Sequence, residues 1–143
     1  MLRGIPDLIS PDLLKILSEM GHGDDLVIGD LNFPAASNAK RLVRLDGHMS
    51  LPILKAVLDL FPLDDFVESP VSLMRVVPGD TTKPVIQDEI RSLVKVWDHR
   101  PTAVGLVDRF EFYERARNAY AIVSTGETAL YACLIIKKGV FRK

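Results

Sequence analysis

The sequence predicts a single α/β domain in which helices cover both faces of a mostly parallel central sheet, a three-layer α/β/α arrangement. Strand-like runs alternate with helix-like segments along the chain. The strand-like runs are continuously apolar, as in "LVIGD" over 26–30, which is typical of strands that are buried on both faces. A length of 143 residues suits one ordinary domain, so we expect residues 1–143 to share one hydrophobic core.

The first helix has a well-marked start. Ser10 is a natural N-cap, and Pro11 stands at the first helical position, where its missing N–H costs nothing. Gly21 is expected to end this helix as the C′ residue. A short buried strand is then expected over 26–30 and a second strand over 41–47.

The rest of the chain repeats this alternation. Ser50 is expected to cap a helix that continues through residue 61. The further expected elements are a strand over 71–77, a helix over 84–97 started by Thr82, a strand over 102–108, a helix over 110–118, and two strands over 120–127 and 129–139 around a turn at Thr125 and Gly126.

Composition excludes several classes of partner. Lys and Arg number 18 against 19 Asp and Glu, and neither sign forms a run, so we expect no nucleic acid partner. No apolar stretch approaches the roughly 20 residues of a membrane helix, and the first ten residues do not resemble a signal peptide. Cys133 is the single cysteine and lies in an apolar run, which indicates a buried structural thiol rather than a nucleophile. We therefore expect a cytoplasmic protein with no membrane partner.

Three polar residues stand where ligands bind in α/β proteins, beyond the carboxyl ends of strands or in adjoining loops. Asp30 ends the first strand, Arg109 follows the strand over 102–108, and His22 lies in the loop after the first helix. Each also has an ordinary explanation. Asp30 suits a turn, Arg109 suits a solvated partner of Glu111 or Asp108, and His22 suits a helix C-terminus. The pattern alone leaves both interpretations open.

Metal and phosphate chemistry find little support in the sequence. His22 with Asp24 and Asp25 is a poor ligand set, because calcium and magnesium need more oxygen ligands at regular spacing and zinc needs another nearby His or Cys. His48 and His99 lie in separate segments. The sequence contains no G-x-x-x-x-G-K-[ST], G-x-G-x-x-G or G-x-S-x-G motif. We expect no metal and no other cofactor.

Four segments point to a known family. They are "EMGHGDDLVIGDLNFPA" (19–35), "RFEFYERA" (109–116), "TGE" (125–127) and "YACLIIKKG" (131–139). Their order and spacing resemble the family of L-fucose mutarotases and D-ribose pyranases, and the resemblance covers essentially the whole chain. The segment "RFEFYERA" and the paired lysines favour the fucose branch, since the ribose branch typically has a histidine at the position of Arg109 and lacks these lysines.

The resemblance implies particular roles for residues. The family's catalytic histidine falls on His22, and its sugar-contacting positions fall on Asp30, Arg109, Tyr131, Ala132 and Cys133. Relatives commonly carry asparagine at the position of Cys133. A thiol is only a weak donor, so backbone contacts are better expected there than a side-chain contact.

The residue types suit mutarotation, in which the sugar ring opens to the free aldehyde, the carbonyl rotates, and the ring closes on its other face. Opening delivers a proton to the ring oxygen while the anomeric hydroxyl loses one, and imidazole performs such transfers near neutral pH. His22 is therefore the expected acid/base group, with flanking glycines that let the chain approach a ligand closely. Asp30 would accept hydrogen bonds from sugar hydroxyls and could also orient or assist the proton transfer. Arg109 would donate to sugar oxygens, and Tyr131 would stack on the sugar or donate to a hydroxyl.

Two alternatives to a mutarotase remain. A D-ribose pyranase would use the same chemistry to convert pyranose to furanose, and a non-catalytic sugar-binding module would use His22 only as a helix cap. The resemblance also implies a homo-oligomer, a decameric ring whose sites are completed by a neighbouring subunit. The apolar run 130–139 could form that contact, or it could be a central strand of its own subunit.

Overall fold

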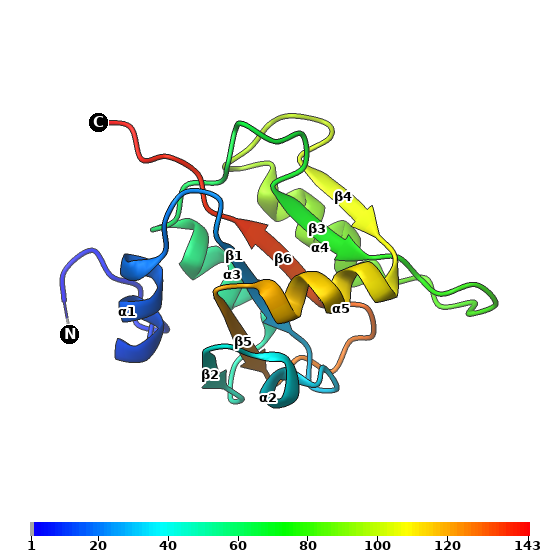
Figure 1. Cartoon of the computed structure of the whole chain (residues 1–143). Coiled ribbons are helices and arrows are strands. Elements are labelled where there is room, and N and C mark those ends of the chain that lie inside the picture. The colour runs from blue at the N-terminus through cyan, green and yellow to red at the C-terminus, as the bar shows by residue number, and fades with distance from the viewer. Residues whose placement is uncertain (1) are drawn as a thin grey trace.

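The computed structural model describes residues 2–143, and within this range five helices alternate with six strands (Figure 1). The helices are α1 (Pro11–Glu19), α2 (Ala35–Asn38), α3 (Ser50–Leu58), α4 (Val85–Val94) and α5 (Arg109–Asn118). The strands are β1 (Asp25–Gly29), β2 (Leu42–Leu45), β3 (Val71–Met74), β4 (Val104–Val107), β5 (Ala121–Thr125) and β6 (Leu134–Lys137). The predicted alternation is confirmed.

The strands form one mixed sheet in the order β2-β5-β1-β6-β3-β4. The pairs β1 with β5, β2 with β5, and β3 with β4 are parallel, while β6 runs antiparallel between β1 and β3. The expectation of a mostly parallel sheet therefore holds, with β6 as the departure. Strands β5 and β6 follow each other in sequence without pairing, so the turn after Thr125 does not form a hairpin.

The last predicted strand is much shorter than expected. It was predicted over 129–139, but residues 129–133 are irregular and β6 begins at Leu134. Tyr131 has a φ of 59°, in the left-handed region that residues other than glycine rarely adopt. This conformation is incompatible with an extended strand, so the segment before β6 is a loop.

Apolar clusters cover the two faces of the sheet, which confirms the three-layer arrangement. One cluster joins the sheet to α1, α3 and α4 through fully buried residues such as Leu13, Ile53 and Ile90. The other joins it to α5 through Phe112 and Ala116. Figure 1 shows α5 in front of the sheet, with α3 and α4 behind it.

The start of α1 agrees with its prediction, whereas the start of α4 does not. The Ser10 side chain accepts a hydrogen bond from the Leu13 N–H at 3.2 Å, so the cap of α1 is confirmed. The predicted cap of α4 is wrong, because this helix starts after Pro84. Thr82 lies outside it and instead donates its hydroxyl to Asp80. The short polar side chains form a local turn, which competes with helix capping.

Glu127, the acid of the "TGE" segment, accepts a hydrogen bond from the first residue of α3, although the two are far apart in the sequence. The prediction that Ser50 caps this helix is wrong, since Ser50 is its first residue and donates its N–H to the Glu127 carboxylate at 3.3 Å. The same carboxylate accepts the Ala129 N–H at 2.9 Å, and the Glu127 carbonyl accepts the Leu31 N–H at 2.8 Å. Glu127 therefore ties α3 to the segments that follow β1 and β5.

Gly126 should not tolerate a side chain. A Cβ atom there would lie 2.2 Å from the backbone oxygen of Asp46, and the Gly126 N–H donates to the His48 carbonyl at 2.9 Å. We expect Gly126→Ala to lower the free energy of unfolding by about 1–3 kcal/mol, the usual cost of overpacking. Urea denaturation measures this. Gly47→Ala is the control, because a Cβ at Gly47 meets open space; equal losses in both variants would contradict the argument.

Throughout residues 2–143, no helix combines the length and the apolar character that crossing a membrane requires.

Candidate active site

A cavity of about 240 Å³ lies at the carboxyl-end edge of the parallel strands. Asp30 follows β1, Val77 follows β3, and Arg109 follows β4, so three chain segments converge there. Four of the predicted sugar-contacting residues share it. The lining residues are Asp30, Asn32, Phe33, Met74, Val77, Asp80, Arg109, Tyr113, Leu130, Tyr131 and Cys133.

Asp30 is held in place by contacts on its backbone and its carboxylate. The residue is 8% exposed, and its Oδ1 accepts the Asn32 N–H at 3.0 Å, which forms a local turn. Its own N–H points at the Cys133 sulfur, 3.4 Å away. These contacts keep the carboxylate at the cavity wall.

Cys133 lies beneath Asp30 and is buried. Burial, followed by the charge of Asp30, raises the pKa of the Cys133 thiol well above its usual value. The group therefore stays protonated at neutral pH, as expected of a structural thiol. Ala132 is fully buried in the main core, which leaves its backbone as the part that could reach a ligand.

Tyr131 lines the cavity, but its hydroxyl proton is already engaged. The hydroxyl donates to the Asp80 carboxylate at 2.5 Å, and this bond, followed by burial, raises the pKa of Tyr131. Hydrogen bonds from Thr82 and Tyr131 lower the pKa of Asp80, which keeps it an acceptor. The Gln87 amide donates to the Tyr131 carbonyl at 3.1 Å and to the Met74 carbonyl at 2.9 Å. Tyr131 can thus offer its ring face to a ligand more readily than a proton.

Arg109 is the first residue of α5 and is exposed at the cavity mouth. Its guanidinium carbon lies 5.6 Å from the centre of the Phe110 ring. Asp108, one of the two partners that the ordinary explanation suggests beside Glu111, pairs instead with Arg75 at 3.1 Å. The guanidinium donors of Arg109 can therefore face a ligand in the cavity.

His22 lies at the opposite edge of the sheet. It precedes β1, whereas Asp30 follows it, and a five-residue strand spans about 17 Å at roughly 3.3 Å per residue. In Figure 1 the loop from α1 to β1 lies near the red C-terminal segment, away from the segment that follows β1. The fold of one chain thus separates His22 from Asp30, Arg109 and Tyr131.

Asp64 is the partner of His22, and no pattern in the sequence predicts this contact. Its side chain is 3% exposed, and its Oδ1 lies 3.1 Å from His22 Nε2 and accepts the Phe66 N–H at 3.0 Å. The Phe66 ring lies 5.2 Å from the imidazole. In the sequence nothing distinguishes Asp64 from its neighbour Asp65, which forms an exposed pair with Arg142. Only the tertiary contact identifies it.

The two acidic residues that follow the "GHG" turn have structural partners. Asp24 accepts the Gly21 N–H at 2.7 Å, and Asp25 pairs with Lys137 at 2.9 Å and with Arg115 at 3.4 Å. Among the side chains that the structure describes, no group of three or more His, Cys, Asp or Glu is placed to hold a metal ion.

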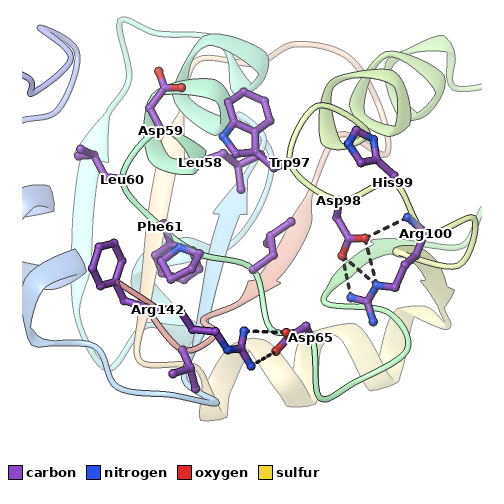
Figure 2. Close-up of a pocket in the computed structure, with 14 residues that line it drawn as sticks. Leu58, Asp59, Leu60, Phe61, Asp65, Trp97, Asp98, His99, Arg100 and Arg142 are labelled. Atoms are coloured by element: carbon purple, nitrogen blue, oxygen red, sulfur yellow. Dashed lines mark hydrogen bonds and ion pairs between the residues drawn. The ribbon is translucent and has the colours of Figure 1, made fainter.

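A larger cavity, of about 640 Å³, lies beside the ends of α3 and α4 and the C-terminal segment (Figure 2). Figure 2 shows Asp65 paired with Arg142 and Asp98 paired with Arg100. Asp59, which also lines this cavity, pairs with Lys55 at 3.0 Å. Since these charges satisfy one another, the smaller cavity with Asp30 is the better candidate for a polar ligand.

The chain matches a known protein family over nearly its whole length. Residues 3–141 match the model of the RbsD / FucU transport protein family. The chain belongs to the RbsD / FucU family. The expected resemblance is therefore confirmed over nearly the full length.

Individual members of the RbsD / FucU family are close in both sequence and structure. An L-fucose mutarotase of Actinobacillus pleuropneumoniae serotype 5b (strain L20) is 46% identical, over 98% of this chain and 97% of the relative. The crystal structure of the fucose mutarotase in complex with L-fucose from Streptococcus pneumoniae is 47% identical, with a TM-score of 0.94 over 99% of this chain and 100% of that one. The FucU structure from Bifidobacterium longum is 52% identical, with a TM-score of 0.95 over 98% and 100% of the two chains.

Proposed function

We propose that this protein is an L-fucose mutarotase, an isomerase that interconverts the α and β anomers of L-fucose in the cytoplasm. The observation that carries the proposal is the convergence of Asp30, Arg109 and Tyr131 on one cavity in a chain of this family. The cavity volume of about 240 Å³ is below the roughly 300–1,000 Å³ of sites for drug-sized ligands, which suits a monosaccharide. Mutarotation transfers no electron, phosphate or carbon, so it needs no cofactor.

The cavity offers complementary contacts for a sugar. The Asp30 carboxylate accepts hydrogen bonds from hydroxyls, and the Arg109 guanidinium donates to sugar oxygens. The ring of Tyr131 provides an apolar face for the C–H side of the sugar, with its hydroxyl retained by Asp80. Cys133 supports this arrangement by holding Asp30 from below rather than by contacting the sugar through its thiol.

His22 is the proposed acid/base group, and Asp64 orients it. When His22 donates its Nε2–H to the buried Asp64 carboxylate, Nδ1 carries the lone pair that accepts a proton. His22 takes the proton of the anomeric hydroxyl and returns it to the ring oxygen as the ring C–O bond breaks, so the step involves no net gain or loss of protons. Ring closure on the other carbonyl face reverses both transfers and yields the second anomer.

Because His22 and the cavity lie at opposite edges of one chain, we propose that a neighbouring copy supplies His22 to each site. Exposed apolar side chains occur at both edges: Phe66 is 68% exposed beside His22, and Leu130 is 54% exposed beside the cavity. A contact between two different surfaces of identical chains is heterologous and closes into a ring when its rotation allows. A decameric ring, implied by the family resemblance, satisfies this requirement.

Substrate preference tests the proposed activity. At equal protein concentration we expect faster anomer exchange with L-fucose than with D-ribose, because "RFEFYERA" places Arg109 at the cavity mouth. Saturation-transfer NMR on both sugars measures these rates. A preference for ribose would support the pyranase alternative, and sugar binding without accelerated exchange would support a binding module.

A further inference from the structure

The segment Lys137–Lys138–Gly139 at the end of β6 lies against the turn that carries His22. Strand β6 pairs with β1 up to Lys137, which is opposite Asp25. Beyond that point the Lys138 N–H donates to the Asp24 carbonyl at 2.9 Å, and the Lys138 carbonyl accepts the Gly23 N–H at 2.8 Å. The backbone pairing of β6 thus extends past the strand into the His22 turn.

Both lysine side chains bind backbone carbonyls around His22. Lys138 Nζ donates to the Leu17 carbonyl at 2.9 Å and to the Met20 carbonyl at 2.5 Å. Helix α1 ends without a basic residue in its own last turn, so Lys138 provides the cation that favours a helix C-terminus. Lys137 Nζ donates to the Gly23 carbonyl at 3.1 Å. Carbonyls on both sides of His22 are therefore held by adjacent lysines.

The same segment also holds the chain that carries Asp64. The Asp64 N–H donates to the Lys137 carbonyl at 3.0 Å, and the Gly139 N–H donates to the Pro62 carbonyl at 2.7 Å. A Cβ on Gly139 would lie 2.4 Å from the Leu63 oxygen, so a glycine is needed for this close approach. One short segment thus fixes the two chain segments that meet in the His22–Asp64 contact.

We infer that Lys137 and Lys138 are positioning residues that hold the His22 imidazole against Asp64. The inference rests on the proposed role of His22 in proton transfer. The lysines need not touch the sugar, since they act through the backbone of the turn. Their loss should therefore lower kcat, while KM should change little because the proposed sugar contacts lie at the other edge of the sheet.

Lys138→Met tests this inference, because methionine keeps an apolar stem but cannot donate to the two carbonyls. We expect kcat for L-fucose exchange to fall about 10- to 100-fold, the effect of a small misplacement of a reacting group. KM should stay within about twofold of the wild-type value. Lys138→Arg should restore part of kcat, because arginine can again donate at that position.

Lys15→Met is the matched control. Lys15 is a lysine in the middle of α1, and its side chain forms an exposed pair with Glu19. This variant should keep wild-type kcat. If Lys138→Met does not fold, Lys137→Met is measured instead. It removes the donor to the Gly23 carbonyl together with the ion pair to Asp25, which keeps Arg115 as a partner, and it makes the same prediction.

A sugar-free readout separates positioning from activity. In protein labelled with ¹⁵N-histidine, three histidines give ring signals, and the His22 signal is the one that His22→Ala removes. Magic-angle-spinning NMR of the neutral ring should show a proton on Nε2 in the wild type and a mixture of tautomers in Lys138→Met. Failure of the wild type to exchange sugars would refute the proposed function but leave this readout intact. An unchanged tautomer, or an equal loss of kcat in Lys15→Met, would overturn the positioning role.

Discussion

Replacing His22 by alanine should slow catalysed anomer exchange by about 10²- to 10⁴-fold, the usual contribution of a general acid/base group. This corresponds to roughly 3–5.5 kcal/mol of activation free energy. The fold should survive, because the His22 side chain is 47% exposed and its polar contact is a single one with Asp64. Asp64→Asn should cause a smaller loss, since the imidazole remains but its ring is held less firmly.

Sugars also mutarotate without an enzyme, so anomer-exchange NMR on His22→Ala needs an enzyme-free reference. Circular dichroism checks that the variant is folded. A histidine that only caps a helix would contribute about 0.3–1 kcal/mol to stability and nothing to the rate. A folded variant with near wild-type exchange would therefore contradict the mechanism and make Asp30 the principal catalytic candidate.

Co-assembly of two inactive variants should restore activity if each site is shared between neighbouring chains. His22→Ala keeps the cavity, and Asp30→Asn keeps the histidine, so a functional site forms wherever an intact His22 faces an intact Asp30. Random co-assembly of equal amounts should restore about one quarter of the wild-type rate, since each of the two positions is intact half of the time. Both variants alone should show only residual exchange.

Co-expression of the two variants with different affinity tags isolates the mixed assemblies for this measurement. Light scattering on the same sample reports their size, and ten chains of 15.9 kDa would give about 159 kDa. Mixing the variants after assembly is the control, because without subunit exchange it should restore nothing. Mixed assemblies that stay inactive, or a monomer at the working concentration, would contradict the shared site.

The local signals in the sequence predicted most of the architecture because they depend on neighbouring residues. Ser10 and Pro11 mark the start of α1 through contacts within one turn, and α1 ends, as predicted, just before Gly21. Continuous apolar runs identified buried strands, since burial on both faces leaves no alternation of polar residues. The order of elements and the three layers followed from these signals. The family resemblance named six site residues, of which Asp30, Arg109, Tyr131 and Cys133 line the cavity whereas His22 and Ala132 do not.

The tertiary structure alone decided which distant residues meet. The hydrogen bond of Glu127 to the start of α3 joins residues 77 positions apart in the sequence. The contact of Asp64 with His22 joins residues 42 positions apart, and the contact of Cys133 with Asp30 joins residues 103 positions apart. Such contacts depend on the order of the strands, in which β6 lies between β1 and β3. The apolar pattern of a strand does not show which strands it pairs with. The separation of His22 from the cavity has the same origin, because the direction of β1 places its two ends at opposite edges. The sequence by itself thus determined the elements and the candidate residues, whereas strand order and direction determined which of them one chain can bring together.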